Sequence, residues 1–154
     1  MPSASFDSPI GRLTVIERDG CIAALSWRGR AGDDIGDEAT PLLADAVGQL
    51  RGYFAGERKR FDLQLLAAAT PEAQAARDAM IAIPYGSTAS YGALAAATGS
   101  SPRAFGQACG ANPLPIIVPC HRVVSSDGSF GFYSGGDGPK TKDWLLAHEG
   151  AALL

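Results

Sequence analysis

The chain is short of histidine, cysteine and long apolar runs, and each shortage excludes a class of protein. Its 154 residues include only two histidines, and the three cysteines lack metal-type spacing, so a Cys/His zinc site is close to excluded. No apolar stretch approaches the roughly 18 residues of a membrane span, and no basic start followed by an apolar segment indicates an export signal. We therefore expect a cytoplasmic protein without a membrane or metal partner, in which Cys21, Cys109 and Cys120 are free thiols.

Positive charge is also limited. The formal net charge of −3 is a mild argument against non-specific nucleic-acid binding, although DNA affinity depends on the local charge of one face. The second half of the chain carries so few basic residues that we expect any DNA binding to be weak. These residues are Arg77, Arg103, Arg122, Lys140 and Lys142.

The first part of the chain is predicted to be β-rich and then helical. Residues 12–18 and 21–27 are strand-like, and Asp19-Gly20 between them is a preferred type I′ hairpin pair. The acidic segment 31–38 is expected to be a solvated loop. Thr40-Pro41 then combines an N-cap with proline at the first helical position, and apolar residues at helical spacing extend this helix to near residue 56.

The alanine run at residues 67–69 is the best candidate domain boundary. Apolar and polar residues alternate over 61–65 just before it, which predicts a half-buried strand. We therefore expect an N-terminal α/β domain over residues 1–67 and a second domain over residues 68–154.

The second part is predicted to consist of short helices. A helix begins at Thr70-Pro71 and ends before the turn Ile83-Pro84-Tyr85-Gly86. Ser90 and Ser101 cap two further helices, which glycines end near residues 99 and 110. Two short helices separated by a tight turn suggest a helix-turn-helix.

A hairpin-like wing is predicted over residues 123–130, around Ser126-Asp127-Gly128, and a final helix over residues 142–148. Short helices followed by a hairpin are typical of a winged helix, which is commonly a DNA-binding module.

The stretch from Asn112 to Val124 contains an adjacent cysteine and histidine. Prolines bracket the apolar run before Cys120, so we expect that run to be extended. A free cysteine is only a few per cent thiolate at neutral pH, and a histidine supplies the base that activates it. Adjacent side chains on a regular helix or strand point apart, so either the backbone turns sharply at Cys120 or a water bridges it to His121. Glu149 is the carboxylate that we expect to orient this imidazole.

Other readings of these residues stay open at this point. Cys120 taken alone also fits a small buried hydrophobe, and His121 a hydrogen-bonded core imidazole. A Cys-His pair can serve acyl transfer in a thiol hydrolase, although no oxyanion motif is visible. The helix-turn-helix also fits a damage-recognising protein that transfers no group. Arg122 is expected to bond a carboxylate or a carbonyl.

Motifs spread from residue 83 to residue 150 carry a more specific signal. Together they resemble the O6-alkylguanine-DNA alkyltransferases, also called methylated-DNA–protein-cysteine methyltransferases, and the Pro-Cys-His-Arg-Val run is highly specific to that family. The first half contains only two weaker matches to the family, Ser8-Pro9-Ile10-Gly11 and Tyr53-Phe54-Ala55-Gly56. The matching motifs are Ile83-Pro84-Tyr85-Gly86, Ser90-Tyr91-Gly92, Arg103-Ala104-Phe105-Gly106, Asn112-Pro113, Pro119-Cys120-His121-Arg122-Val123, Tyr133-Ser134-Gly135-Gly136 and Trp144-Leu145-Leu146-Ala147-His148-Glu149-Gly150.

The resemblance implies a role for each matching residue. Cys120 would accept the alkyl group, with His121 as a water-mediated base and Glu149 completing the relay. Asn112 would bridge backbone groups around the Cys120 turn, and Tyr91 would donate a proton or hydrogen bond to the guanine oxygen. Residues implied to bind the flipped base are Val123, Tyr133, Ser134 and Gly135, and those implied to bind DNA are Arg103, as an arginine finger entering from the minor groove, with Ala104 and Gly106.

The resemblance also implies a fold and a reaction. The fold would be a small ribonuclease-H-like α/β domain followed by a winged-helix domain. The reaction would be DNA repair by one transfer from double-stranded DNA carrying O6-alkylguanine, with base flipping, a monomeric protein and no cofactor. A thioether does not release its alkyl group without activation, so each molecule would act once. The related damage-recognition proteins lack the cysteine, so Cys120 argues against that alternative.

Overall fold

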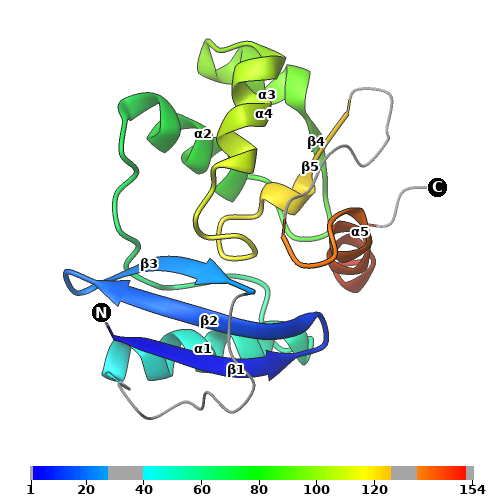
Figure 1. The fold of residues 1–154 in the computed structure, drawn as a ribbon. Coiled ribbons are helices and arrows are strands. Elements are labelled where there is room, and N and C mark those ends of the chain that lie inside the picture. Colours follow the sequence, from blue (N-terminus) through cyan, green and yellow to red (C-terminus); the bar gives the residue numbers. More distant parts are fainter. Residues whose placement is uncertain (1, 28–39, 126–134, 152–154) are drawn as a thin grey trace. The chain divides into compact units, whose positions relative to one another are not determined.

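The computed structural model describes residues 2–27, 40–125 and 135–151 of the chain, which has a mixed α/β fold (Figure 1). The chain divides into two compact units, Met1–Leu66 and Ala67–Leu154. The predicted loop at 31–38 and most of the predicted wing, residues 126–130, lie outside the described residues.

The first unit contains an antiparallel sheet of three strands in the order β1-β2-β3. The strands are β1 (Ser3–Ser8), β2 (Gly11–Arg18) and β3 (Cys21–Ser26). The predicted hairpin between β2 and β3 is confirmed, because φ is 54° at Asp19 and 74° at Gly20, as a type I′ turn requires. Sequence reasoning missed β1, in which three serines replace the β-branched residues that usually indicate a strand.

Helix α1 (Pro41–Phe54) packs against this sheet and completes the core of the unit. The predicted cap is present, since the Thr40 hydroxyl accepts a hydrogen bond from the backbone N–H of Leu43 at 3.1 Å. The same hydroxyl donates to the Glu17 carboxylate on β2, which ties the start of the helix to the sheet. Leu43 and Leu50 on the helix and Leu13 on β2 are fully buried.

The strand predicted over residues 61–65 is wrong except at one residue. Leu65 forms an isolated parallel bridge with Ile22, whose N–H donates to the carbonyl of Gln64 at 2.8 Å, while residues 61–63 have no strand partner. The buried side chain of Gln49 binds their backbone instead: its Nε2 donates to the carbonyl of Asp62 at 3.0 Å, and its Oε1 accepts from the N–H of Asp62 at 2.8 Å. A helix side chain therefore satisfies the backbone groups that a neighbouring strand would have bound.

We expect Gln49→Ala to lower the free energy of unfolding by about 1–3 kcal/mol, because it leaves the Asp62 backbone groups without these partners. The measurement is urea denaturation of the whole chain. Gln64→Ala is the matched control, since that side chain is exposed and its removal should change stability by less than about 0.5 kcal/mol. Equal losses in the two variants would contradict the assignment.

The second unit is built from four helices among its described residues. These are α2 (Pro71–Ile81), α3 (Tyr91–Thr98), α4 (Pro102–Gly110) and α5 (Pro139–His148). The predicted caps Thr70, Ser90 and Ser101 each accept a hydrogen bond from the backbone N–H three residues later.

A two-stranded parallel sheet connects α3 to the cysteine segment. Strand β4 (Ala89–Ser90) leads directly into α3, and it pairs with β5 (Val123–Val124), which follows the Cys-His-Arg sequence. This pairing places Tyr91 next to the cysteine segment, although the two are distant in sequence.

Two further predictions for this unit are corrected by the structure. The final helix begins at Pro139 and not at residue 142, because Gly138 turns the chain at φ 66° and proline takes the first helical position. The run before Cys120 is not extended: the backbone reverses over residues 114–118, and the N–H of Val118 donates to the carbonyl of Leu114 at 2.8 Å. No helix in the described parts of the chain is long and apolar enough to cross a membrane.

Candidate active site

The cysteine segment is a tight turn. Residues Cys120–Arg122 form one turn of 3-10 helix, and the N–H of Cys120 donates to the carbonyl of Val118 at 2.7 Å. Ile116, 1% exposed, precedes this turn with φ at 74°, a left-handed conformation that is costly for a β-branched residue. The sharp backbone turn that the sequence left open is therefore present at Cys120.

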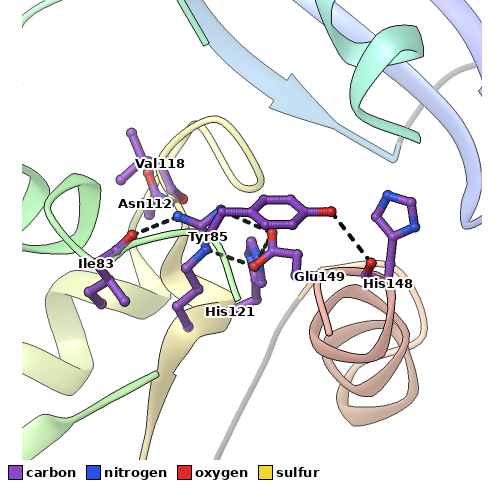
Figure 2. A network of polar contacts seen from close by, with 8 residues as sticks. Ile83, Tyr85, Asn112, Val118, His121, His148 and Glu149 are labelled. Carbon is purple, nitrogen blue, oxygen red and sulfur yellow. Dashed lines mark hydrogen bonds and ion pairs between the residues drawn. The ribbon is translucent and has the colours of Figure 1, made fainter. Parts of the chain in front are cut away.

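Asn112 stabilises this turn from the end of α4. Its side-chain Nδ2 donates to the carbonyl of Val118 at 3.0 Å, and both residues are labelled in Figure 2. Its Oδ1 accepts from the N–H of Leu114 at 3.0 Å. The Asn112 amide also lowers the pKa of the Cys120 thiol and so favours its thiolate. One amide therefore bridges both ends of the reversed loop that precedes the thiol.

A buried ion network lies behind the turn. The His121 Nε2 is 2.8 Å from the Glu149 Oε2, and both side chains are fully buried (Figure 2). The Arg122 guanidinium donates to the same carboxylate from Nε at 2.8 Å and from an Nη atom at 3.0 Å. Its other Nη atom donates to the carbonyl of Ile83 at 2.7 Å, so Arg122 bonds both a carboxylate and a carbonyl, as expected.

The Ile83-Pro84-Tyr85-Gly86 turn encloses the carboxylate end of this network. The Tyr85 hydroxyl donates to the carbonyl of His148 at 3.4 Å, as Figure 2 shows. Gly86 has φ 83°, and a Cβ atom there would lie only 3.2 Å from the carbonyl oxygen of Glu149. The motif therefore requires glycine at this position, because any side chain would be strained and would press on the backbone of Glu149.

Glu149 determines which nitrogen of His121 carries the proton. A carboxylate only accepts hydrogen bonds, so the neutral imidazole donates from Nε2 and leaves Nδ1 with its lone pair. Nδ1 is buried and has no hydrogen-bond partner among the described residues. Burial lowers the pKa of His121, and Glu149 only partly opposes this, so the ring is neutral at pH 7. A neutral imidazole with a bare Nδ1 is able to accept a proton.

Cys120 lies at the surface of this cluster with 8% of its area exposed. Burial raises the pKa of its thiol, whereas the Asn112 hydrogen bond and the charge of Lys142 favour the thiolate. The thiol therefore stays protonated at rest and needs a base to become a nucleophile.

Lys142 is a site residue that sequence reasoning missed. Its ammonium group donates to the carbonyl of Val123 at 2.6 Å, and none of its surface is exposed. Burial lowers its pKa, while Cys120 and Cys109 oppose this. The signal was present in the sequence, because Lys142 lies on the same helical stripe as the buried Leu145, Leu146 and Glu149.

Tyr91 is the first residue of α3 and lies near the thiol. Burial raises the pKa of its phenol to about 12, and the nearby Cys109 and Cys120 add to this effect. The Lys142 ammonium lies 5.8 Å from the centre of its ring. Tyr91 is thus a protonated hydrogen-bond donor at neutral pH.

The residues predicted to bind the base lie partly outside the described chain. Tyr133 and Ser134 are not among the described residues, and Gly135 is the first residue after that gap. Val123 is also implied to bind the base; its carbonyl already accepts from Lys142, which leaves this oxygen one further lone pair.

The predicted DNA-binding residues lie in the first turns of α4. Arg103 and Ala104 are exposed, whereas Gly106 is half-buried, and a Cβ atom there would lie 3.9 Å from the Tyr91 ring. Of the five basic residues in this unit, Arg77, Arg122 and Lys142 are buried. Only Arg103 and Lys140 therefore present an exposed positive charge.

The three cysteines are free thiols, as predicted. Within the described ranges no cluster of three or more His, Cys, Asp and Glu side chains could bind a metal ion.

The geometry defines a class of site: a turned cysteine with a buried His-Glu-Arg network behind it and a short two-helix motif beside it. Two family models match the chain. Residues 1–67 match "6-O-methylguanine DNA methyltransferase, ribonuclease-like domain", and residues 71–151 match "6-O-methylguanine DNA methyltransferase, DNA binding domain". The chain therefore belongs to the 6-O-methylguanine DNA methyltransferase family, and the resemblance seen in its motifs is confirmed.

Individual relatives agree with this assignment. The chain is 41% identical over 139 residues to the constitutive methylated-DNA–protein-cysteine methyltransferase of Bacillus subtilis, covering 84% of each chain. It is 37% identical over 155 residues to a methylated-DNA–protein-cysteine methyltransferase of Methanosarcina acetivorans, covering 96% of this chain and 97% of the relative. The crystal structure of Mycobacterium tuberculosis OGT in complex with DNA aligns with a TM-score of 0.84 at 37% identity, covering 98% of this chain and 94% of that one.

We expect Lys142→Met to move the pH dependence of Cys120 labelling by iodoacetamide to higher pH, because it removes a charge that favours the thiolate. The labelling rate at Cys120, read by peptide mapping between pH 6 and 10, measures this. Lys142→Arg retains the charge and should restore most of the difference.

Lys140→Met is the matched control for this experiment, since Lys140 is exposed on the same helix. It should leave the labelling profile unchanged. Identical profiles for Lys142→Met and the unmodified chain would show that the ammonium does not act on the thiol.

Proposed function

We propose that this chain repairs DNA by moving an alkyl group from the O6 atom of guanine to its own Cys120. Alkyl transfer from DNA to a protein cysteine is the activity of the family to which the chain belongs. The observation that carries the assignment of the acceptor is the position of Cys120 in a tight turn next to an imidazole whose tautomer Glu149 fixes.

The first chemical step is the activation of the thiol. His121 is neutral, its Nδ1 bears a lone pair, and we propose that it takes the Cys120 proton through a bridging water. The imidazolium that forms is stabilised by Glu149 at 2.8 Å, while Asn112 and Lys142 favour the new thiolate. Each of these groups is already oriented before the reaction begins.

The second step is the transfer. The thiolate attacks the alkyl carbon, a sulfur–carbon bond forms, and the bond between that carbon and the guanine oxygen breaks. Tyr91 is suited to assist, because a phenol with a pKa of about 12 donates a hydrogen bond to an oxygen that gains negative charge. The product is a thioether, and no residue described here activates it for release, so each molecule acts once.

The reacting atom lies inside the base stack, so the nucleotide must leave the duplex at a cost of a few kcal/mol. We propose that α3 and α4 act as a helix-turn-helix and that Arg103, exposed on α4, fills the space left by the base. A guanidinium suits this role because it is planar, stacks on bases and is always charged. Ala104 and Gly106 would let the helix approach the minor groove closely.

Several finer features belong to this proposal. We propose that the first unit is ribonuclease-H-like and the second a winged helix, with domains at 1–67 and 68–154. Val123, Tyr133, Ser134 and Gly135 would bind the flipped base. The protein would act as a cytoplasmic monomer without a cofactor.

Mass spectrometry of the intact chain after incubation with an oligonucleotide duplex containing O6-methylguanine tests this function. We expect the chain to gain the mass of one methylene group, with one equivalent transferred and the modification mapped to Cys120. Cys120→Ala should gain nothing while keeping its fold, and Cys21→Ala should behave like the unmodified chain. DNA binding without any gain of mass would instead identify a damage-recognition protein.

We expect Arg103→Ala to slow transfer from duplex DNA about tenfold or more, which corresponds to roughly 1.4 kcal/mol of the few kcal/mol that extrusion costs. Transfer from a single-stranded oligonucleotide should change much less, because no base pair has to open. Arg18→Ala, an exposed arginine of the first unit, is the control. Equal slowing on both substrates would argue against a role for Arg103 in extrusion.

A further inference from the structure

The proposed function leaves one buried nucleophile unused. Cys109 lies in the last turn of α4, half-buried, and its thiol donates to the Met80 thioether with the two sulfur atoms 3.7 Å apart. A thioether accepts a hydrogen bond but donates none, so this contact requires the protonated thiol. Burial raises the pKa of Cys109 to about 12, which agrees with that state.

Cys109 and Cys120 belong to one compact cluster. The carbonyl of Cys109 accepts from the N–H of Asn112 at 3.3 Å, and the Asn112 side chain donates to the carbonyl of Val118 at 3.0 Å. The N–H of Cys120 donates to that same carbonyl at 2.7 Å. The charge of Lys142 favours the thiolate of both cysteines. The Asn112 hydrogen bonds thus hold the end of α4, which carries Cys109, against the turn that carries Cys120.

The two thiols differ in what surrounds them. Cys120 has the Asn112 amide, which favours the thiolate, and the neighbouring base His121, which is able to take its proton. The contact of Cys109 with Met80 stabilises only the protonated form. Oxidants react with thiolates, so Cys120 is the first target and Cys109 remains available as a second, reduced thiol.

We propose that Cys109 is a resolving thiol, which captures an oxidised Cys120 as an intramolecular disulfide. In the first step the Cys120 thiolate attacks a peroxide, the O–O bond breaks, and a sulfenic acid and one water result after protonation. In the second step the Cys109 sulfur attacks the sulfenic sulfur, the S–S bond forms, the S–O bond breaks, and the hydroxyl leaves with the Cys109 proton as a second water. Two thiols are oxidised and one peroxide is reduced to two waters.

The disulfide would protect the Cys120 thiol from irreversible oxidation. A sulfenic acid that finds no thiol is oxidised further to sulfinic acid, which ordinary thiols do not reduce, whereas a disulfide is reversible. This benefit rests on the proposed function, because a protein that acts once would otherwise be consumed without repairing a lesion. The bond itself depends only on the two sulfur atoms.

Treatment of the whole chain with hydrogen peroxide tests the proposal. After the remaining thiols are blocked, we expect an intact mass lower by two hydrogen atoms and a cross-linked peptide pair that contains Cys109 and Cys120. Dithiothreitol should then restore the reduced mass and most of the methyl-accepting capacity.

Cys109→Ser should instead accumulate two or three oxygen atoms at Cys120 and should recover almost no capacity with dithiothreitol. Cys109→Ala serves as a second variant, with circular dichroism to verify that both variants fold. Cys21→Ser is the matched control and should form the same cross-link as the unmodified chain.

Oxygen added at Cys120 of the unmodified chain without any cross-link would overturn the proposal, and so would full recovery of Cys109→Ser. The cross-link is read without DNA, and methyl transfer is measured separately on the reduced chain. A failure of the disulfide is therefore distinguishable from a failure of the alkyltransferase function.

Discussion

The buried ion pair of Glu149 and Arg122 is the interaction on which the candidate active site depends. Charges are costly to bury unless they are paired and hydrogen-bonded, and here two donor atoms of Arg122 meet both carboxylate oxygens of Glu149. The third donor reaches the carbonyl of Ile83. Three segments that are distant in sequence, the turn after α2, the cysteine turn and the end of α5, are held together at this point. If Arg122 were lost, the buried Glu149 would lose the guanidinium that contacts both of its carboxylate oxygens.

The carboxylate of this pair also determines which nitrogen of His121 carries the proton. Because Glu149 occupies Nε2 of His121, the basic nitrogen of the ring is Nδ1. Near the thiol, Tyr91 stays a donor and Lys142 supplies positive charge. Among the described residues, the site therefore combines a proton acceptor, a hydrogen-bond donor and a cation near a single sulfur. A thiol nucleophile requires such a base and a nearby cation, and an oxygen leaving group requires such a donor.

Local signals in the sequence predicted most of the helices and the β2–β3 hairpin. The pairs Thr40-Pro41, Thr70-Pro71 and Ser101-Pro102 identified helix starts, because a capping hydroxyl and a preset proline φ act within one turn of the chain. The pairing of His121 with Glu149 was also expected. The predictions that were wrong concern segments whose conformation depends on residues distant in sequence. The segment at 61–65 looks like a strand, but the Gln49 side chain takes both backbone hydrogen bonds of Asp62.

The reversal before Cys120 could not be predicted for a related reason. Proline favours extended neighbours, yet Ile116 adopts a left-handed conformation because Asn112 and the surrounding core hold the loop closed. The burial of the Lys142 ammonium also depends on a distant partner, the Val123 carbonyl that accepts from it. Helix periodicity indicates which face of a helix is buried, but it does not identify the hydrogen-bond partner of a polar side chain on that face.

The burial of most basic side chains in the second unit affects how the protein would search DNA for lesions. Non-specific attachment to DNA comes from cations that displace condensed counterions, and in the second unit only Arg103 and Lys140 face outward. We therefore expect brief residence on each undamaged stretch, with frequent hopping to new ones and little sliding. Fast dissociation is an advantage for a protein that transfers only one alkyl group, because few molecules then remain bound to undamaged DNA.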